Sequence, residues 1–280
     1  MDEQRKNYSN FRALTDYYFK ITKRWWAVTW SLKAAVFAVG LIAVFFPNIS
    51  IYITISVGIL SFASEFCNVK SNHNKGIAEG FLRKLDFRDS FGWDISTLEI
   101  ADAFVKLSKK AKEQFALAGQ PDNYFASNET TGWKRAMQNL QESAWWSKHL
   151  AEVAGWYCFS LTIILVVVSL LTLIGSSLMI SKTEELTNIN RIVIAVLLII
   201  VSFGLIPLTF NYFTFSKKAE ASERIATELL KTDSANIEAQ AIKAFNEYHL
   251  VRASAPLIPS WLWRRKKDTL NEAWKCFIKN

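Results

Sequence analysis

The sequence predicts an all-α membrane protein with four transmembrane helices in two hairpins and helical cytosolic regions. Three observations predict this fold class: four long apolar stretches in two close pairs, cationic residues gathered on one side of them, and helical periodicity in the polar segments. About 20 predominantly apolar residues span the core of a bilayer. The expected order is an N-terminal cytosolic helix, a hairpin, a helical insert, a second hairpin and a C-terminal helical region with a basic tail, at residues 1–24, 25–66, 67–155, 156–215 and 216–280.

The first pair of apolar stretches contains two charges. Trp25–Phe46 includes Lys33, which we expect to reach the cytoplasmic interface along its aliphatic stem. Ile49–Phe66 includes Glu65 near its end. An ionisable group at membrane depth costs free energy unless it pairs or meets water, so Glu65 is a candidate functional residue.

The second pair is more apolar than the first. Trp156–Ile180 and Ile192–Phe215 contain no charged side chain. Both are apolar around the whole helix, which excludes an amphipathic helix on the surface of a soluble protein. Pro207 should kink the last span or loosen it locally, because proline cannot donate a helical hydrogen bond.

The distribution of Lys and Arg predicts the orientation of the chain. Residues 1–24, 67–155 and 216–280 hold six, twelve and twelve of them, whereas the turn after Phe46 holds none and residues 181–191 hold two. Cationic residues are retained on the cytoplasmic side of a membrane. We therefore expect both termini and the central segment to lie in the cytoplasm, with the two short turns on the other side of the membrane.

The polar segments show helical periodicity, and none shows the alternation typical of strands. The expected helices cover residues 8–24, 74–85, 97–117, 132–152, 219–231 and 237–251. Asp86–Asp94 is expected to be a loop, and the two prolines of Ala255–Pro259 should break the chain before the tail. Each half has a Trp pair, a hairpin and a polar helix, so a duplication is one interpretation; a generic likeness of hairpin proteins is the other.

No catalytic, cofactor or paired-cysteine metal motif occurs, so we do not expect an enzyme, a cofactor or a metal site. The three histidines are isolated and are expected to be ordinary polar residues: His73, His149 and His249. An acidic group is expected to form a solvated loop and a helix cap, with a metal site as the alternative: Asp86, Asp89, Asp94, Glu99 and Asp102. The scattered cysteines are expected to be buried or reduced thiols: Cys67, Cys158 and Cys276.

Polar side chains recur at helical spacing within the apolar stretches. Such faces either hold helices together or line a path for water, and both interpretations stay open. The candidate pore-lining or gating residues are Thr54, Ser61, Glu65, Ser169, Thr172, Ser176 and Asn211.

The C-terminal tail combines tryptophan with four successive cations. The candidate residues are Trp261, Trp263, Arg264, Arg265, Lys266 and Lys267. Indoles that insert into the interface and cations that meet anionic headgroups would form a membrane-surface contact. The alternative is an anionic ligand such as a nucleotide, because tryptophan can stack on a base and arginine can hold phosphate.

The chain resembles the bacterial four-transmembrane effectors associated with SMODS nucleotidyltransferases in antiphage signalling operons. The order of its segments is similar to theirs over the whole chain. Two short motifs add to the resemblance: Gln141–Trp146 before the third span, and Leu257–Trp263 near the end, similar to an Ile-Pro-Asp-Trp-Leu/Tyr pattern. The N-terminal half also looks like a related two-span effector type.

The resemblance implies an effector that forms or gates a pore and disrupts the inner membrane. It also implies a homo-oligomer in the lipid bilayer, triggered by a cyclic or linear oligonucleotide messenger, with no role for duplex nucleic acid. A basic cytosolic face would attract such an anion. Two alternatives remain: a membrane-anchored scaffold that binds a partner, and a small channel without an immune role.

Overall fold

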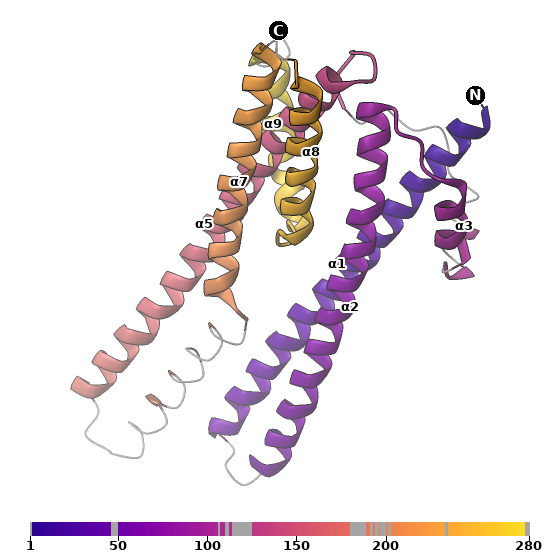
Figure 1. Cartoon of the computed structure of the whole chain (residues 1–280). Coiled ribbons are helices and arrows are strands. Elements are labelled where there is room, and N and C mark those ends of the chain that lie inside the picture. The colour runs from indigo at the N-terminus through magenta and orange to yellow at the C-terminus, as the bar shows by residue number, and fades with distance from the viewer. Residues whose placement is uncertain are drawn as a thin grey trace. The chain divides into compact units, whose positions relative to one another are not determined.

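The computed structural model describes residues 2–45, 50–105, 107–109, 112–113, 125–179, 189–190, 193, 196, 200, 203–232 and 235–277. Every regular element among them is a helix, and no strand occurs there (Figure 1). The all-α prediction is thus confirmed. The long helices are α1 Asp2–Phe45, α2 Ser50–Phe91, α3 Thr97–Val105, α5 Trp133–Met179, α7 Leu205–Lys231, α8 Ile237–Ser254 and α9 Ser260–Phe277.

The chain forms two compact units. Unit 1 comprises Met1–Thr22, Asn72–Glu152 and Phe213–Asn280, and unit 2 comprises Lys23–Ser71 and Val153–Tyr212. The helices α1, α2, α5 and α7 each contribute one part to each unit. The apolar stretches therefore belong to unit 2, apart from the last residues of the fourth, and the polar helices belong to unit 1.

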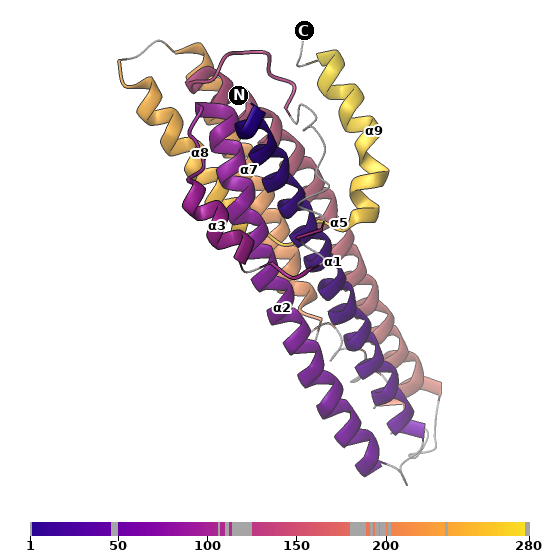
Figure 2. The ribbon, with the colours of Figure 1, turned by 90° about the vertical axis from the view of Figure 1, so that its right-hand side faces the viewer.

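In unit 2, the second part of α1 packs antiparallel against the first part of α2, and both views show the pair side by side (Figures 1 and 2). The Ser64 hydroxyl donates a hydrogen bond to the Thr29 carbonyl oxygen at 3.4 Å. Trp30 extends the packing, because its ring centroid lies 5.2 Å from that of Phe203. The predicted first hairpin is therefore packed through small polar and aromatic side chains.

Two helices of the described part are long and apolar enough to cross a membrane, by length and composition. They are α2, within Ile51–Phe91, and α5, within Trp133–Gly175, and most of the side chains in their apolar windows are exposed in the single chain. These two helices hold the second and third predicted spans. The first predicted span is helical within α1, which is not one of the two, and part of Ile192–Phe215 lies outside the described residues.

The fourth apolar stretch is interrupted a few residues before Pro207, which the sequence predicted would kink the last span or loosen it locally. The chain turns at Phe203–Gly204, and Gly204 has φ 63°, a left-handed conformation that favours glycine. The helix α7 begins at Leu205, so Pro207 lies in its first turn. Proline is tolerated there because the amides of a first helical turn have no intrahelical partner.

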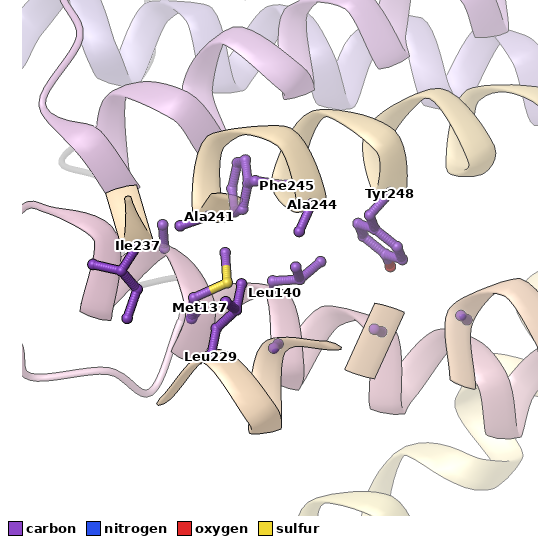
Figure 3. Close-up of a cluster of buried hydrophobic side chains, with 12 residues drawn as sticks. Met137, Leu140, Leu229, Ile237, Ala241, Ala244, Phe245 and Tyr248 are labelled. Atoms are coloured by element: carbon purple, nitrogen blue, oxygen red, sulfur yellow. The ribbon is translucent and has the colours of Figure 1, made fainter. Parts of the chain in front are cut away.

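The core of unit 1 lies where α5, α7 and α8 meet (Figure 3). Its buried side chains are Ala136, Met137, Leu140, Ala144, Ala219, Ala226, Leu229, Ile237, Ala241, Ala244, Phe245 and Tyr248. Several small residues of α5, α7 and α8 let the three helices approach closely. The Tyr248 hydroxyl is shared with Ser143 at 2.9 Å and Ser147 at 2.8 Å, so its polar end is satisfied inside the core.

Two helix boundaries differ from the sequence prediction. Asp86–Phe91 continues α2 instead of forming a loop, and Gly92, at φ 75°, follows the last turn. The continuation is held by Arg135, whose guanidinium donates to the Asp89 carboxylate at 2.9 Å and to its carbonyl oxygen at 2.8 Å. The expected helix 97–117 is shorter: α3 ends at Val105, Leu107 and Ser108 are not helical, and residues 106, 110–111 and 114–117 lie outside the described part.

Candidate functional site: a buried charge network and the polar faces of the apolar helices

Unit 1 contains a buried charge network between α2 and α8. Arg252 of α8 is its centre, with Nε donating to Glu79 Oε2 at 3.1 Å and Nη2 donating to Asp86 Oδ2 at 3.3 Å. Glu79 and Asp86 lie two turns apart on α2, so one guanidinium spans both carboxylates. Because a buried charge is tolerated only when it is paired and hydrogen-bonded, these contacts fix the position of α8 on α2.

His249 completes the network from the same helix as Arg252. Its Nδ1 lies 3.2 Å from Arg252 Nη2, and Arg252 can only donate, so Nδ1 accepts and the neutral ring carries its proton on Nε2. That nitrogen faces Asp86 Oδ2 at 3.7 Å. Burial and the nearby guanidinium of Arg252 hold the pKa of His249 well below its usual value, with Arg83 contributing. His249 is therefore a neutral, buried ring, not the isolated polar histidine that we expected.

Asp86 is buried, at 2% exposure, and its pKa is shifted in the direction opposite to that of His249. Burial raises the pKa of Asp86 to about 6, against the lowering effect of Arg252 and Arg12 and with a smaller raising effect of Glu79. The expectation of a solvated acidic loop is thus wrong for Asp86. A group with a pKa near 6 changes charge close to physiological pH, so the network has one member that titrates there.

Lys75 of α2 also belongs to the network and binds the C-terminal end of α8. Its ammonium donates to the Ala253 carbonyl oxygen at 2.8 Å and also to the Ala255 carbonyl oxygen. A cation is favourable at the C-terminus of a helix, where the last carbonyls have no intrahelical partner. Burial lowers the pKa of Lys75, with Glu79 acting in the opposite direction.

The charged groups of the network pair with one another. It holds two cations, two carboxylates and a neutral ring, and in the described residues no group of three or more His, Cys, Asp and Glu could hold a metal ion. Its charges neutralise one another, which suits a structural latch between α2 and α8. A periodicity signal was present in the sequence, because Lys75, Glu79 and Asp86 share one face of a helix.

The predicted polar face of α2 is exposed in the single chain. Thr54, Ser61 and Glu65 are exposed, whereas the side of α2 that packs in unit 2 runs through Ile53 and Ser64, one residue earlier than Thr54 and Glu65. Glu65 is 63% exposed, and its Oε1 lies 3.7 Å from Lys33 Nζ. Lys33 therefore pairs with Glu65, where the sequence led us to expect that it only reached for the interface.

The predicted faces of α5 and α7 divide into buried and exposed residues. Ser169 is buried, and its hydroxyl donates to the Leu165 carbonyl oxygen at 2.7 Å, so it packs in unit 2 and reaches no water path in the single chain. Thr172 is exposed and donates back to the Val168 carbonyl oxygen at 2.8 Å. Asn211 is exposed on α7, and the Ser176 side chain lies outside the described residues.

The tail residues lie on α9, which begins directly after the predicted chain break. Trp261 and Trp263 are 48% and 42% exposed. Lys266 is half-buried, and the other three cations are exposed: Arg264, Arg265 and Lys267. Most of this candidate surface is therefore exposed on α9.

Comparisons with known proteins add no relative. No protein-family model matched the chain, and neither the curated proteins nor the solved structures gave a match.

Proposed function

We propose that this chain is a membrane effector of bacterial antiphage defence, which forms or gates a pore in the inner membrane. In this proposal, unit 2 inserts as four spans, and unit 1 and both termini face the cytoplasm. Two apolar helices in the described residues, and a charge bias that favours the same orientation, support insertion. The proposal also follows the resemblance in segment order and motifs to four-span effectors.

One observation supports the proposed pore. The apolar part of α2 has a polar face whose side chains are exposed in the single chain. Thr54, Ser61 and Glu65 are exposed there, and a side chain added at Gly58 would meet open space, with no neighbouring atom within 4 Å of its Cβ. Polar groups facing lipid tails cost free energy, so copies of the chain would gain by turning these faces toward one another or toward water. An oligomer with this face inward would surround a polar path.

The continuity of the helices supports a trigger in unit 1. The helices α2 and α5 each pass without interruption from polar residues of unit 1 into their apolar stretches. A rigid helix transmits a shift at one end to the other, so a messenger bound to unit 1 can change the association of the spans. The net charge of +8 favours an anionic messenger such as a cyclic or linear oligonucleotide.

The alternative function is a membrane-anchored scaffold. The Lys33–Glu65 ion pair favours it, because the two charges in the first hairpin satisfy each other without a water path. A small channel without an immune role remains the third candidate, and it shares the polar face but not the trigger.

The test follows membrane potential with a dye in bacteria that express the chain alone or with a SMODS-class nucleotidyltransferase. We expect depolarisation only with the nucleotidyltransferase, and we expect Thr54→Leu with Ser61→Leu to remove most of it. The matched control is Ser56→Leu, since Ser56 is exposed on the opposite side of the same helix and donates to the Tyr52 carbonyl oxygen at 2.8 Å.

The remaining outcomes separate the candidates. Depolarisation that persists in the Thr54→Leu, Ser61→Leu variant would contradict the pore-lining face. Depolarisation without the nucleotidyltransferase would indicate a channel that opens by itself. The absence of depolarisation in both conditions would favour the scaffold.

A further inference from the structure

The start of α9 is linked to α2 through the end of α8. Lys75 fixes the end of α8 through the carbonyl oxygens of Ala253 and Ala255, and α9 begins five residues later at Ser260. On the continuous helix α2, Lys75 is nine residues beyond Phe66, the last residue of the second apolar stretch. At 1.5 Å per residue, that separation is about 14 Å along the helix.

The basic end of α9 is the end that follows the turn after α8. Trp274, near the end of α9, packs on Trp145 of α5 with ring centroids 5.3 Å apart, and both views show α9 rising away from the turn after α8 (Figures 1 and 2). Leu262, at the start of α9, is buried in the chain. A packed apolar side chain near each end therefore anchors the helix in unit 1.

The first two turns of α9 carry exposed indoles and cations around the helix. Trp261 and Trp263 are exposed within one turn of each other, and Lys267 Nζ lies 5.1 Å from the Trp263 ring centroid. The exposed acidic residues Asp268 and Glu272 follow only later along the helix. The first two turns therefore concentrate positive charge beside two amphipathic rings.

We propose that the first two turns of α9 bind the anionic headgroups of the membrane into which unit 2 inserts. Indoles favour the headgroup level of a bilayer, and successive cations are attracted to an anionic leaflet. The site rests on the membrane insertion in the proposed function and adds to it a lipid class and a contact surface. Each cation removed should weaken the docked state on the order of fivefold.

The test uses the full chain in lipid nanodiscs, with an environment-sensitive fluorophore on the cysteine introduced by Ser260→Cys. The native cysteines Cys67, Cys158 and Cys276 are replaced by alanine in all variants. Some of the lipids carry a quencher on the headgroup, and the discs contain phosphatidylcholine alone or with phosphatidylglycerol. We expect strong quenching in the discs with phosphatidylglycerol, weaker quenching in neutral discs, and a loss of the difference at high salt.

Two variants with the same change in net charge distinguish the site from a general effect of charge. Neutralising the four cations at the start of α9 by Arg264→Gln, Arg265→Gln, Lys266→Gln and Lys267→Gln should abolish the lipid dependence. Neutralising four cations elsewhere in unit 1 by Arg224→Gln, Lys231→Gln, Lys243→Gln and Lys275→Gln should preserve it. Equal quenching in both kinds of disc, or equal behaviour of the two variants, would overturn the proposal.

Two further measurements identify other outcomes. A fluorophore that is shielded in detergent by added single-stranded oligonucleotide, but is not quenched by lipid, would assign this surface to nucleic acid and overturn the proposal. Carbonate extraction of membranes tests insertion independently. A chain that stays in the membrane without lipid quenching refutes the α9 site alone, whereas a chain released by carbonate refutes the membrane insertion in the proposed function.

Discussion

His249 and Asp86 face each other in unit 1 and respond to pH in opposite directions. The pKa of His249 is held well below 6.5, so below that pH the unfolded chain binds more protons than the native chain at this ring. Stability from His249 is therefore present above pH 6.5 and lost as the pH falls. The pKa of Asp86 is raised from 3.8 to about 6, so its contribution is present below pH 3.8 and lost as the pH rises through 6.

The first prediction concerns His249→Gln. Between pH 7.5 and 6 the native chain should lose stability through His249, and below pH 6 the opposite effect of Asp86 should offset that loss. The variant lacks the His249 contribution and keeps that of Asp86, so its stability relative to the native chain should rise by up to about 1.4 kcal/mol per pH unit as the pH falls below 6.5. Thermal unfolding in detergent at pH 7.5, 6 and 5 measures the difference.

The control for this prediction is His73→Gln, because His73 is exposed on α2. That variant should follow the native chain at every pH. A stability difference between His249→Gln and the native chain that does not change with pH would show that the buried ring titrates as it does in the unfolded chain.

At the scale of single elements, the sequence predicted which segments are helical better than where they end. The apolar period of α8 was visible along the chain, and Pro256 and Pro259 marked its end. The end of α2 was missed because Asp86 and Asp89 resemble loop residues, and what keeps them helical is a partner from another helix. Arg135 binds Asp89 and Arg252 binds Asp86, and neither pairing has a local signal.

The second prediction concerns Lys75, which links α2 to the end of α8. The change Lys75→Met keeps the aliphatic stem and removes the ammonium, leaving the Ala253 and Ala255 carbonyl oxygens without their donor. Hydrogen bonds to a charged group contribute about 1.5–3 kcal/mol, so the melting temperature should fall. Hydrogen exchange should also become faster in the last turn of α8, whereas the amides of α3 should keep their rates.

Lys84→Met is the matched control for this change. Lys84 also lies on α2 and pairs with Glu99 at 2.8 Å, but both side chains are partly exposed. Such a pair contributes about 0–1 kcal/mol, so this variant should stay close to the native chain. Equal losses in the two variants would show that Lys75 does not support α8 in particular.

At the scale of the whole molecule, composition and charge predicted the class of structure, whereas they did not predict the buried charge network. Apolar stretches and helical periods are local properties, and they account for the all-α fold and the two apolar helices. The network depends on a contact between Arg252 and Asp86, which are 166 residues apart in the chain. A single sequence carries no signal for such a pairing until the helices are placed in space.

The last prediction concerns the orientation of the whole chain, which follows from the concentration of Lys and Arg in three of its segments. Cys276 is exposed near the end of α9, so a membrane-impermeant maleimide should label it in inverted inner-membrane vesicles but not in intact spheroplasts. A cysteine introduced by Lys182→Cys, between the third and fourth apolar stretches, should show the reverse pattern in a chain with Cys276→Ser. Labelling of both positions from the same side would require an even number of spans between them, and it would therefore exclude the predicted fourth span.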